Sequence, residues 1–142
     1  MKKIILMLTM TICFALNANC QGWYTGNQSS SSSYSANASL TIQNRSSYTL
    51  TVKIMRTGGR GLYQTLVISP QSSGYVSFSR SDTFYTKTKA SKSFETLYKK
   101  SGTFSIQCDE NGYSQATMEF YVSSGSGSSG QSISKNEFES NK

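Results

Sequence analysis

The chain has 142 residues, with 14 Lys and Arg, 7 Asp and Glu and no His, so its formal net charge is +7. The absence of His excludes Ser-His-Asp and Cys-His catalysis and any His-ligated metal site, and three Cys are too few for a four-thiolate zinc site or a disulfide-dense scaffold. Aromatic residues make up 12% of the chain, which is typical of a folded protein. The length predicts one domain.

The first twenty residues have the pattern of an export signal. Lys2 and Lys3 give a basic start, and residues 4–16 are apolar apart from two Thr. As a helix with a rise of about 1.5 Å per residue, this run would cover roughly 20 Å, which is too short for a bilayer core of about 30 Å. We therefore predict that residues 1–20 are a signal peptide, and that the protein is exported to the periplasm, the cell surface or the medium.

The end of this signal has three interpretations. Ala18 and Cys20 are small residues two positions apart, which favours cleavage before Gln21, and cleavage after Ala18 is the second interpretation. In the third, Cys20 is the lipidated first residue of a lipoprotein, although Asn19 departs from the small residue that such a motif normally has before the Cys. The sequence Ala18-Asn19-Cys20 followed by Gln21 resembles bacterial export signals.

The cysteines allow few disulfides. Cys13 is removed with a signal of residues 1–20, so a Cys20–Cys108 bridge forms only if Cys20 remains in the protein without a lipid. Because Cys108 ends an alternating apolar run, we expect its side chain to be buried.

Two low-complexity segments frame the remaining chain. Residues 21–33 are rich in Ser and Gly and predict a flexible tether, and residues 125–142 predict a disordered Gly/Ser-rich C-terminal tail. Neither composition buries enough apolar surface to offset the entropy of ordering. Residues 34–124 are therefore the predicted folded domain.

This domain shows the period-two alternation of β-strands. Apolar residues alternate with polar ones in short runs, and turn residues separate the runs every eight to twelve positions. The run 62–68 is apolar on both faces, which favours a central strand. The sequence Asp109-Glu110-Asn111-Gly112 predicts a hairpin, with Asn-Gly at the two positive-φ positions of a type I′ turn. The expected strands are 36–42, 48–54, 62–68, 75–79, 83–89, 94–98, 103–108 and 113–122.

The pattern predicts an all-β fold. We expect a single antiparallel β-sandwich of the immunoglobulin-like kind with about 7–9 strands, and a small β-barrel is the alternative. The acids of the domain do not form a recognised catalytic pattern, and the spacing of an EF-hand calcium loop is missing. We therefore predict a non-enzymatic protein with no catalytic residue, no metal and no cofactor.

Basic residues gather in the middle of the chain. Nine Lys and Arg between Lys53 and Lys100 face only Asp82 and Glu95, so this segment carries +7. In a strand, Lys87 and the residues two positions before and after it share one face. A basic, aromatic surface of this kind attracts polyanions, although lysines also protect edge strands from aggregation. The candidate polyanion-binding residues are Tyr85, Lys87, Lys89, Lys92, Tyr98, Lys99 and Lys100.

Two functions fit these features. The first is an exported bacterial binding or structural module that contacts anionic glycans or an envelope surface through its basic face, or a protein partner by strand addition. Nucleic acid is not an expected partner, because no recognised binding motif occurs. The alternative is a secreted effector or hydrolase inhibitor that acts through exposed loops such as residues 57–61.

Overall fold

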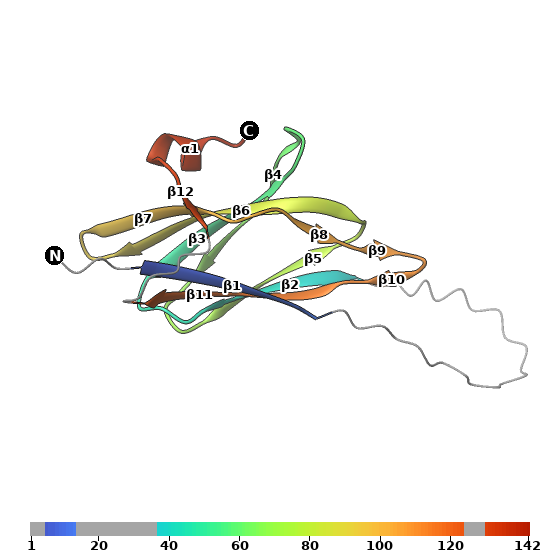
Figure 1. Ribbon diagram of the computed structural model, residues 1–142, viewed down its shortest axis with the longest axis horizontal. Helices are drawn as coiled ribbons and strands as arrows, with labels where there is room; N and C mark the ends of the chain where they lie inside the picture. The colour runs from blue at the N-terminus through green and yellow to red at the C-terminus, as the bar shows by residue number, and fades with distance from the viewer. Residues whose placement is uncertain (1–4, 14–36, 124–129) are drawn as a thin grey trace, which may run out of the picture.

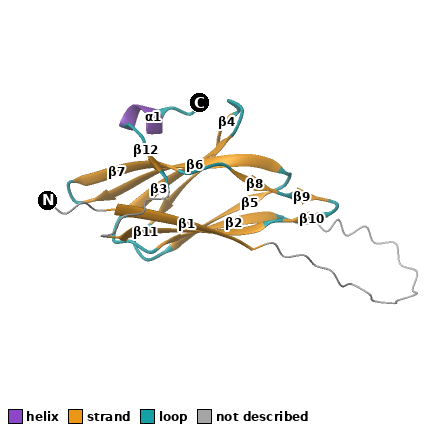
Figure 2. Cartoon of the chain, in the orientation of Figure 1, coloured by secondary structure: helices purple, strands orange, loops and turns teal. Residues whose placement is uncertain are grey.

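A computed structural model describes residues 5–13, 37–123 and 130–142. Within these ranges the protein is mostly β, with several antiparallel strand pairs and one short helix (Figures 1 and 2). Two larger sheets lie as two layers, and their buried side chains form one hydrophobic cluster. The sheets do not close on each other, so the alternative prediction of a small β-barrel is wrong.

The first layer, sheet A, has the strand order β1-β11-β2-β5. β11 runs parallel to β2 and antiparallel to β1, and β2 runs antiparallel to β5. The alternation in the sequence is confirmed here, because Leu40, Val76 and Met118 all turn into the core. The bounds are β1 (Ile5–Cys13), β2 (Ala38–Asn44), β5 (Ser73–Phe78) and β11 (Gln115–Ser123).

The second layer, sheet B, has the strand order β12-β7-β6-β3-β4, and β8 pairs with the beginning of β6. A separate two-stranded hairpin, β9 with β10, joins β8 to β11. The bounds are β3 (Thr49–Arg56), β4 (Gly61–Ile68), β6 (Asp82–Lys92), β7 (Glu95–Lys100), β8 (Phe104–Ile106), β9 (Cys108–Asp109), β10 (Gly112–Tyr113) and β12 (Gln131–Ser132).

An aromatic cluster joins the two layers. The rings of Phe78 on β5 and Phe84 on β6 have centroids 4.7 Å apart, and Phe84 also meets Tyr63 edge-on at 5.4 Å. Phe104 on β8 stacks on the other side of Phe84 at 6.0 Å. The sheets are therefore joined by ring contacts at the end of the molecule where β5 leads into β6.

The C-terminal segment, residues 130–142, contains a strand and a short helix, whereas the sequence predicted a disordered tail over residues 125–142. β12 pairs with the edge strand β7, and the short helix α1 (Lys135–Glu139) follows it. Ser134 caps this helix, because its side chain accepts a hydrogen bond from the Glu137 N–H at 3.1 Å. Phe138 is only 3% exposed and lies 5.5 Å from the Tyr98 ring, so the packed unit is larger than the predicted domain.

Three local expectations are corrected. The hairpin lies where predicted, but its central residues are Glu110 and Asn111, and neither has a positive φ. The Asp109 carboxylate instead accepts the Asn111 N–H at 2.9 Å, a contact that lowers the pKa of Asp109 and forms an Asx turn. β4 is an edge strand rather than a central one, with Val67 71% exposed. Cys108 is half-buried rather than buried.

The apolar run of the predicted export signal contains β1, which pairs along its whole length with β11. Cys20 and the predicted tether of residues 21–33 lie outside the described residues. No described helix is long and apolar enough to cross a membrane.

Candidate functional site

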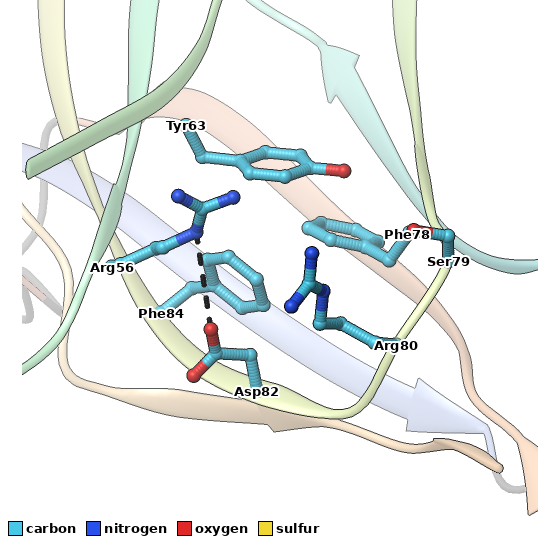
Figure 3. A pocket seen from close by; sticks show the side chains of 7 residues that line it. All are labelled: Arg56, Tyr63, Phe78, Ser79, Arg80, Asp82 and Phe84. Atoms are coloured by element: carbon cyan, nitrogen blue, oxygen red, sulfur yellow. Dashed lines mark ion pairs between the residues drawn. The ribbon is translucent and has the colours of Figure 1, made fainter. Parts of the chain in front are cut away.

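A small recess opens where β3 and β5 end and β6 begins. We call it the arginine–aromatic recess. Its walls combine charged and aromatic side chains, and it encloses about 50 Å³ (Figure 3). The lining residues are Arg56, Tyr63, Phe78, Ser79, Arg80, Asp82 and Phe84.

A β-bulge brings Tyr63 into this recess. Ile54 pairs with Gln64, but the next residue of β3 pairs with Leu62, so Tyr63 is the extra residue on β4. Its ring stacks on Phe78 with a centroid distance of 5.2 Å, and its hydroxyl donates to the Ser77 carbonyl oxygen at 2.9 Å. Both ends of the side chain are thus fixed.

One aspartate holds two of the arginines. Arg60 donates from both terminal nitrogens to the Asp82 carboxylate, with Nη1 to Oδ2 at 3.0 Å. The Arg56 Nε lies 3.9 Å from the same carboxylate, and its guanidinium lies 4.9 Å from the Tyr63 ring centroid. A forked pair of this kind is geometrically specific. It fixes the β3–β4 turn against the beginning of β6.

The environment of Asp82 keeps it ionised. Burial by itself would raise the pKa of this carboxyl, but hydrogen bonds from Arg60 and from the Thr83 N–H, with the charges of Arg60 and Arg56, lower it below its usual value. Because the folded-state pKa is lowered, this contribution to stability is fully present above the ordinary Asp pKa of about 3.9 and is lost as the pH falls through the folded-state pKa. The ion pairs are therefore intact at neutral pH.

Arg80 differs from the other two arginines. It lies in the turn between β5 and β6, is exposed, and forms no ion pair or hydrogen bond with any described residue. Figure 3 shows its guanidinium and that of Arg56 turned toward the recess, beside the rings of Phe78 and Phe84. Three arginines thus surround one aspartate, and the excess positive charge favours an anion.

The size of the recess limits what it can hold. Pockets that enclose a whole small molecule measure about 300–1,000 Å³, whereas a cavity needs about 10–15 Å³ to hold one water. About 50 Å³ therefore suits a few waters or one carboxylate or sulfate group. The geometry fits the acidic group of a larger ligand rather than an enclosed substrate.

The lysines singled out from the sequence are only partly brought together. Register places Lys87 opposite Lys100, and Lys89 opposite Tyr98, on the outer face of sheet B. Tyr85 is on this face too, with its ring 4.8 Å from the Lys100 amine.

The remaining two candidate lysines lie apart from that face. Lys99 pairs in register with Thr88, which is a core-facing position, and its amine donates to the Ser132 hydroxyl at 2.8 Å. Lys92 ends β6 and donates to the Ser47 hydroxyl at 2.8 Å. The predicted seven-residue surface is therefore not one continuous surface.

Lys87 is not on an open surface, which corrects the expectation from the sequence. It is 2% exposed, and its amine donates to the carbonyl oxygens of Glu137 at 2.7 Å and Ser140 at 2.9 Å. Burial lowers its pKa, and the Glu137 carboxylate opposes that shift. The C-terminal segment covers the centre of the predicted polyanion surface.

The covered lysine belongs to a lysine row formed by Lys53, Lys87 and Lys100 at directly opposed positions of β3, β6 and β7. Like charges at such positions repel each other. Lys53 donates to the Phe138 carbonyl oxygen at 3.1 Å, and the Lys100 amine lies 3.7 Å from the Glu137 carboxylate. The C-terminal segment thus supplies the acceptors that the row requires.

Among the described residues, no group of three or more His, Cys, Asp and Glu is placed to hold a metal ion. Arg56, Arg60 and Arg80 were counted in the basic segment of the sequence, but we did not predict that they lie near one another. Their positions at turns beside a single aspartate were the available signal. No protein-family model, curated protein or solved structure matches the chain.

Proposed function

We propose that the protein is an exported, non-enzymatic binding module that acts in the periplasm or at the cell surface, and that its arginine–aromatic recess binds the acidic groups of an anionic glycan. The proposal includes an immunoglobulin-like sandwich as the finer description of the fold, which the two-layer arrangement of sheets A and B supports.

The position of Arg80 carries this proposal. Arg56 and Arg60 are already engaged by Asp82, so their charge is partly neutralised and their positions are fixed. Arg80 lines the same recess as Arg56, and no described residue engages its donors. A guanidinium presents donors in a rigid fork that matches carboxylate and sulfate oxygens.

A glycan with repeated acidic groups fits the recess better than an isolated small acid. The recess is small and has room for only one acidic group. A ligand that makes this single charge contact would therefore gain little affinity. An extended polyanion adds further contacts and is drawn to the positive molecule over a distance. The mature chain after loss of residues 1–20 keeps 12 basic and 7 acidic residues, a net charge of +5.

Arg80→Gln is expected to weaken binding of heparin, used as a sulfated glycan probe, by about fivefold at low salt, because one charge contact contributes about 1 kcal/mol. The difference should shrink as salt rises, since the Debye length falls from about 10 Å at 0.1 M to about 3 Å at 1 M. Isothermal titration of heparin into both proteins measures the effect.

Arg45→Gln is the matched control, because it removes the same charge far from the recess, at a side chain paired with Glu119. It should bind heparin nearly as well as the wild type. Equal losses in Arg45→Gln and Arg80→Gln would show that only net charge matters, and the recess would lose its role.

The alternative function is a secreted effector or hydrolase inhibitor, and one observation speaks against it and one for it. The turn at residues 57–61 is held against β6 by Arg60, so it is not a free loop that could insert into a target. Phe94, in contrast, stands fully exposed at the tip of the β6–β7 hairpin, at 107% of its reference area. Inhibition of a hydrolase by the wild type that disappears in Phe94→Ala would favour this alternative.

A further inference from the structure

The strand β1 occupies the outer edge of sheet A with a regular apolar pattern. Its nine residues pair antiparallel with β11. The register places Ile12, Met10 and Leu8 opposite Ala116, Met118 and Phe120. These three residues of β11 are buried core residues. Positions directly opposite each other in an antiparallel pair share one face of the sheet. The edge of β11 therefore accommodates a strand with apolar residues at every second position.

Removal of the predicted signal peptide would take this strand away. β1 lies within residues 1–20, and β11 would then become the edge of a three-stranded sheet, β11-β2-β5. An edge strand presents unpaired backbone donors and acceptors, which is a ready template for another strand. The loss also opens one side of the core beside Met118 and Phe120, and exposing such side chains is unfavourable.

We propose that the edge of β11 vacated by export processing binds an extended segment of a partner protein. This inference rests on the export part of the proposed function and is independent of the recess. The partner strand runs antiparallel to β11 and carries apolar side chains at alternate positions, as β1 does. Main-chain hydrogen bonds give affinity, and the alternate apolar side chains complete the core.

Outside the described strands, residues 21–142 have no segment whose sequence meets this requirement. Residues 21–37 contain Trp23 and Tyr24, but these are adjacent and would point to opposite faces of a strand. The rest of that stretch is mainly Ser, Gly, Asn and Gln, without four apolar residues at alternate positions. The alternating segments between residues 38 and 123 already lie within the two sheets, so a second copy could donate one only by unfolding. A different protein is therefore the proposed donor.

A peptide with the sequence of β1, with Cys13→Ser and flanking lysines for solubility, is a direct probe of the edge. It should bind the exported, processed protein with 1:1 stoichiometry, measured by fluorescence anisotropy. Amide hydrogen exchange over residues 115–120 should slow at least about tenfold when it binds. An exported protein that is unfolded alone and folds on addition of the peptide would support the proposal equally.

Two controls make the test specific. A peptide that also carries Leu8→Ser and Met10→Ser should bind about a hundredfold more weakly, because it lacks two of the apolar side chains that the proposed pairing turns toward the core. The unprocessed precursor should not bind the peptide, because β1 already fills the edge.

Four outcomes would overturn the proposal. The first is equal binding of the peptide to precursor and processed protein, and the second is no binding to the processed protein. The third is slow exchange over residues 115–120 in the free processed protein, which would mean that its own tether, or a second copy if it is dimeric, fills the edge. The fourth is an intact mass showing that the exported protein keeps residues 1–20. Heparin binding that depends on Arg80 can survive the first three outcomes, so the two proposals fail separately.

Discussion

Replacing Phe84 with Ala is expected to lower the free energy of unfolding by about 3–5 kcal/mol. Phe84 is 1% exposed, and its ring contacts those of Phe78, Tyr63 and Phe104, so truncation leaves a cavity at the point where the two sheets meet. The surrounding rings come from three different strands and cannot all move to fill it. Denaturant unfolding followed by circular dichroism measures the change.

Phe94→Ala is the matched control, because it deletes the same ring at a fully exposed position. Exposed substitutions usually change stability by about 0.5 kcal/mol or less. The two variants should therefore differ by several kcal/mol. Similar unfolding midpoints for both would mean that the aromatic cluster does not join the sheets as described.

Lys87→Met is expected to destabilise the protein by about 1.5–3 kcal/mol, the range for losing hydrogen bonds to a charged group. Met keeps most of the side-chain length, but it leaves the partly buried carbonyl oxygens of Glu137 and Ser140 without the Lys87 donor. The C-terminal segment should then detach more often. Limited proteolysis should cut within residues 130–142 faster than in the wild type.

Lys89→Met provides the comparison, since Lys89 lies two positions along the same strand and forms no hydrogen bond or ion pair with the described residues of the C-terminal segment. It should leave both stability and proteolysis nearly unchanged. A Lys87→Met protein that keeps its stability but loses heparin affinity would contradict the structural role of Lys87 and restore the predicted polyanion surface.

The sequence predicted those parts of the fold that depend on local alternation. Leu40, Val76 and Met118 are buried because successive residues of a strand face opposite sides, and this pattern is visible in a short window of sequence. The parallel pairing of β11 with β2 joins residues more than seventy positions apart. Nothing in either segment alone specifies that neighbour, so the sheet order was beyond the sequence.

The site was predicted less well, for the same physical reason. Period-two spacing correctly placed Lys87 on the outer face of β6, but its burial depends on a helix some fifty residues later. The signals for that helix were present, because Ser134 and Glu137 have capping-box spacing and Phe138 is the one large aromatic residue of the tail. The Ser- and Gly-rich stretch before them outweighed this short pattern.

The recess forms where β3 and β5 end and β6 begins, and local patterns in the sequence could not predict it. Its bulge at Tyr63 appears only in the pairing of β3 with β4. Arg56 and Arg60 share the Asp82 carboxylate, and this depends on how the β3–β4 turn folds over the beginning of β6. Composition identified an excess of positive charge, and only the fold shows that Arg56 and Arg60 pair with Asp82 while Arg80 pairs with no described acid.

The most direct test of the proposed function is an amide chemical-shift titration of the protein with a short sulfated heparin oligosaccharide. We predict that the largest shifts occur at Arg56, at Tyr63 and over residues 79–82, and that Arg80→Gln needs about fivefold more oligosaccharide to reach the same shifts. Shifts confined to the outer face of sheet B around Tyr98 and Lys100, unchanged by Arg80→Gln, would contradict this prediction.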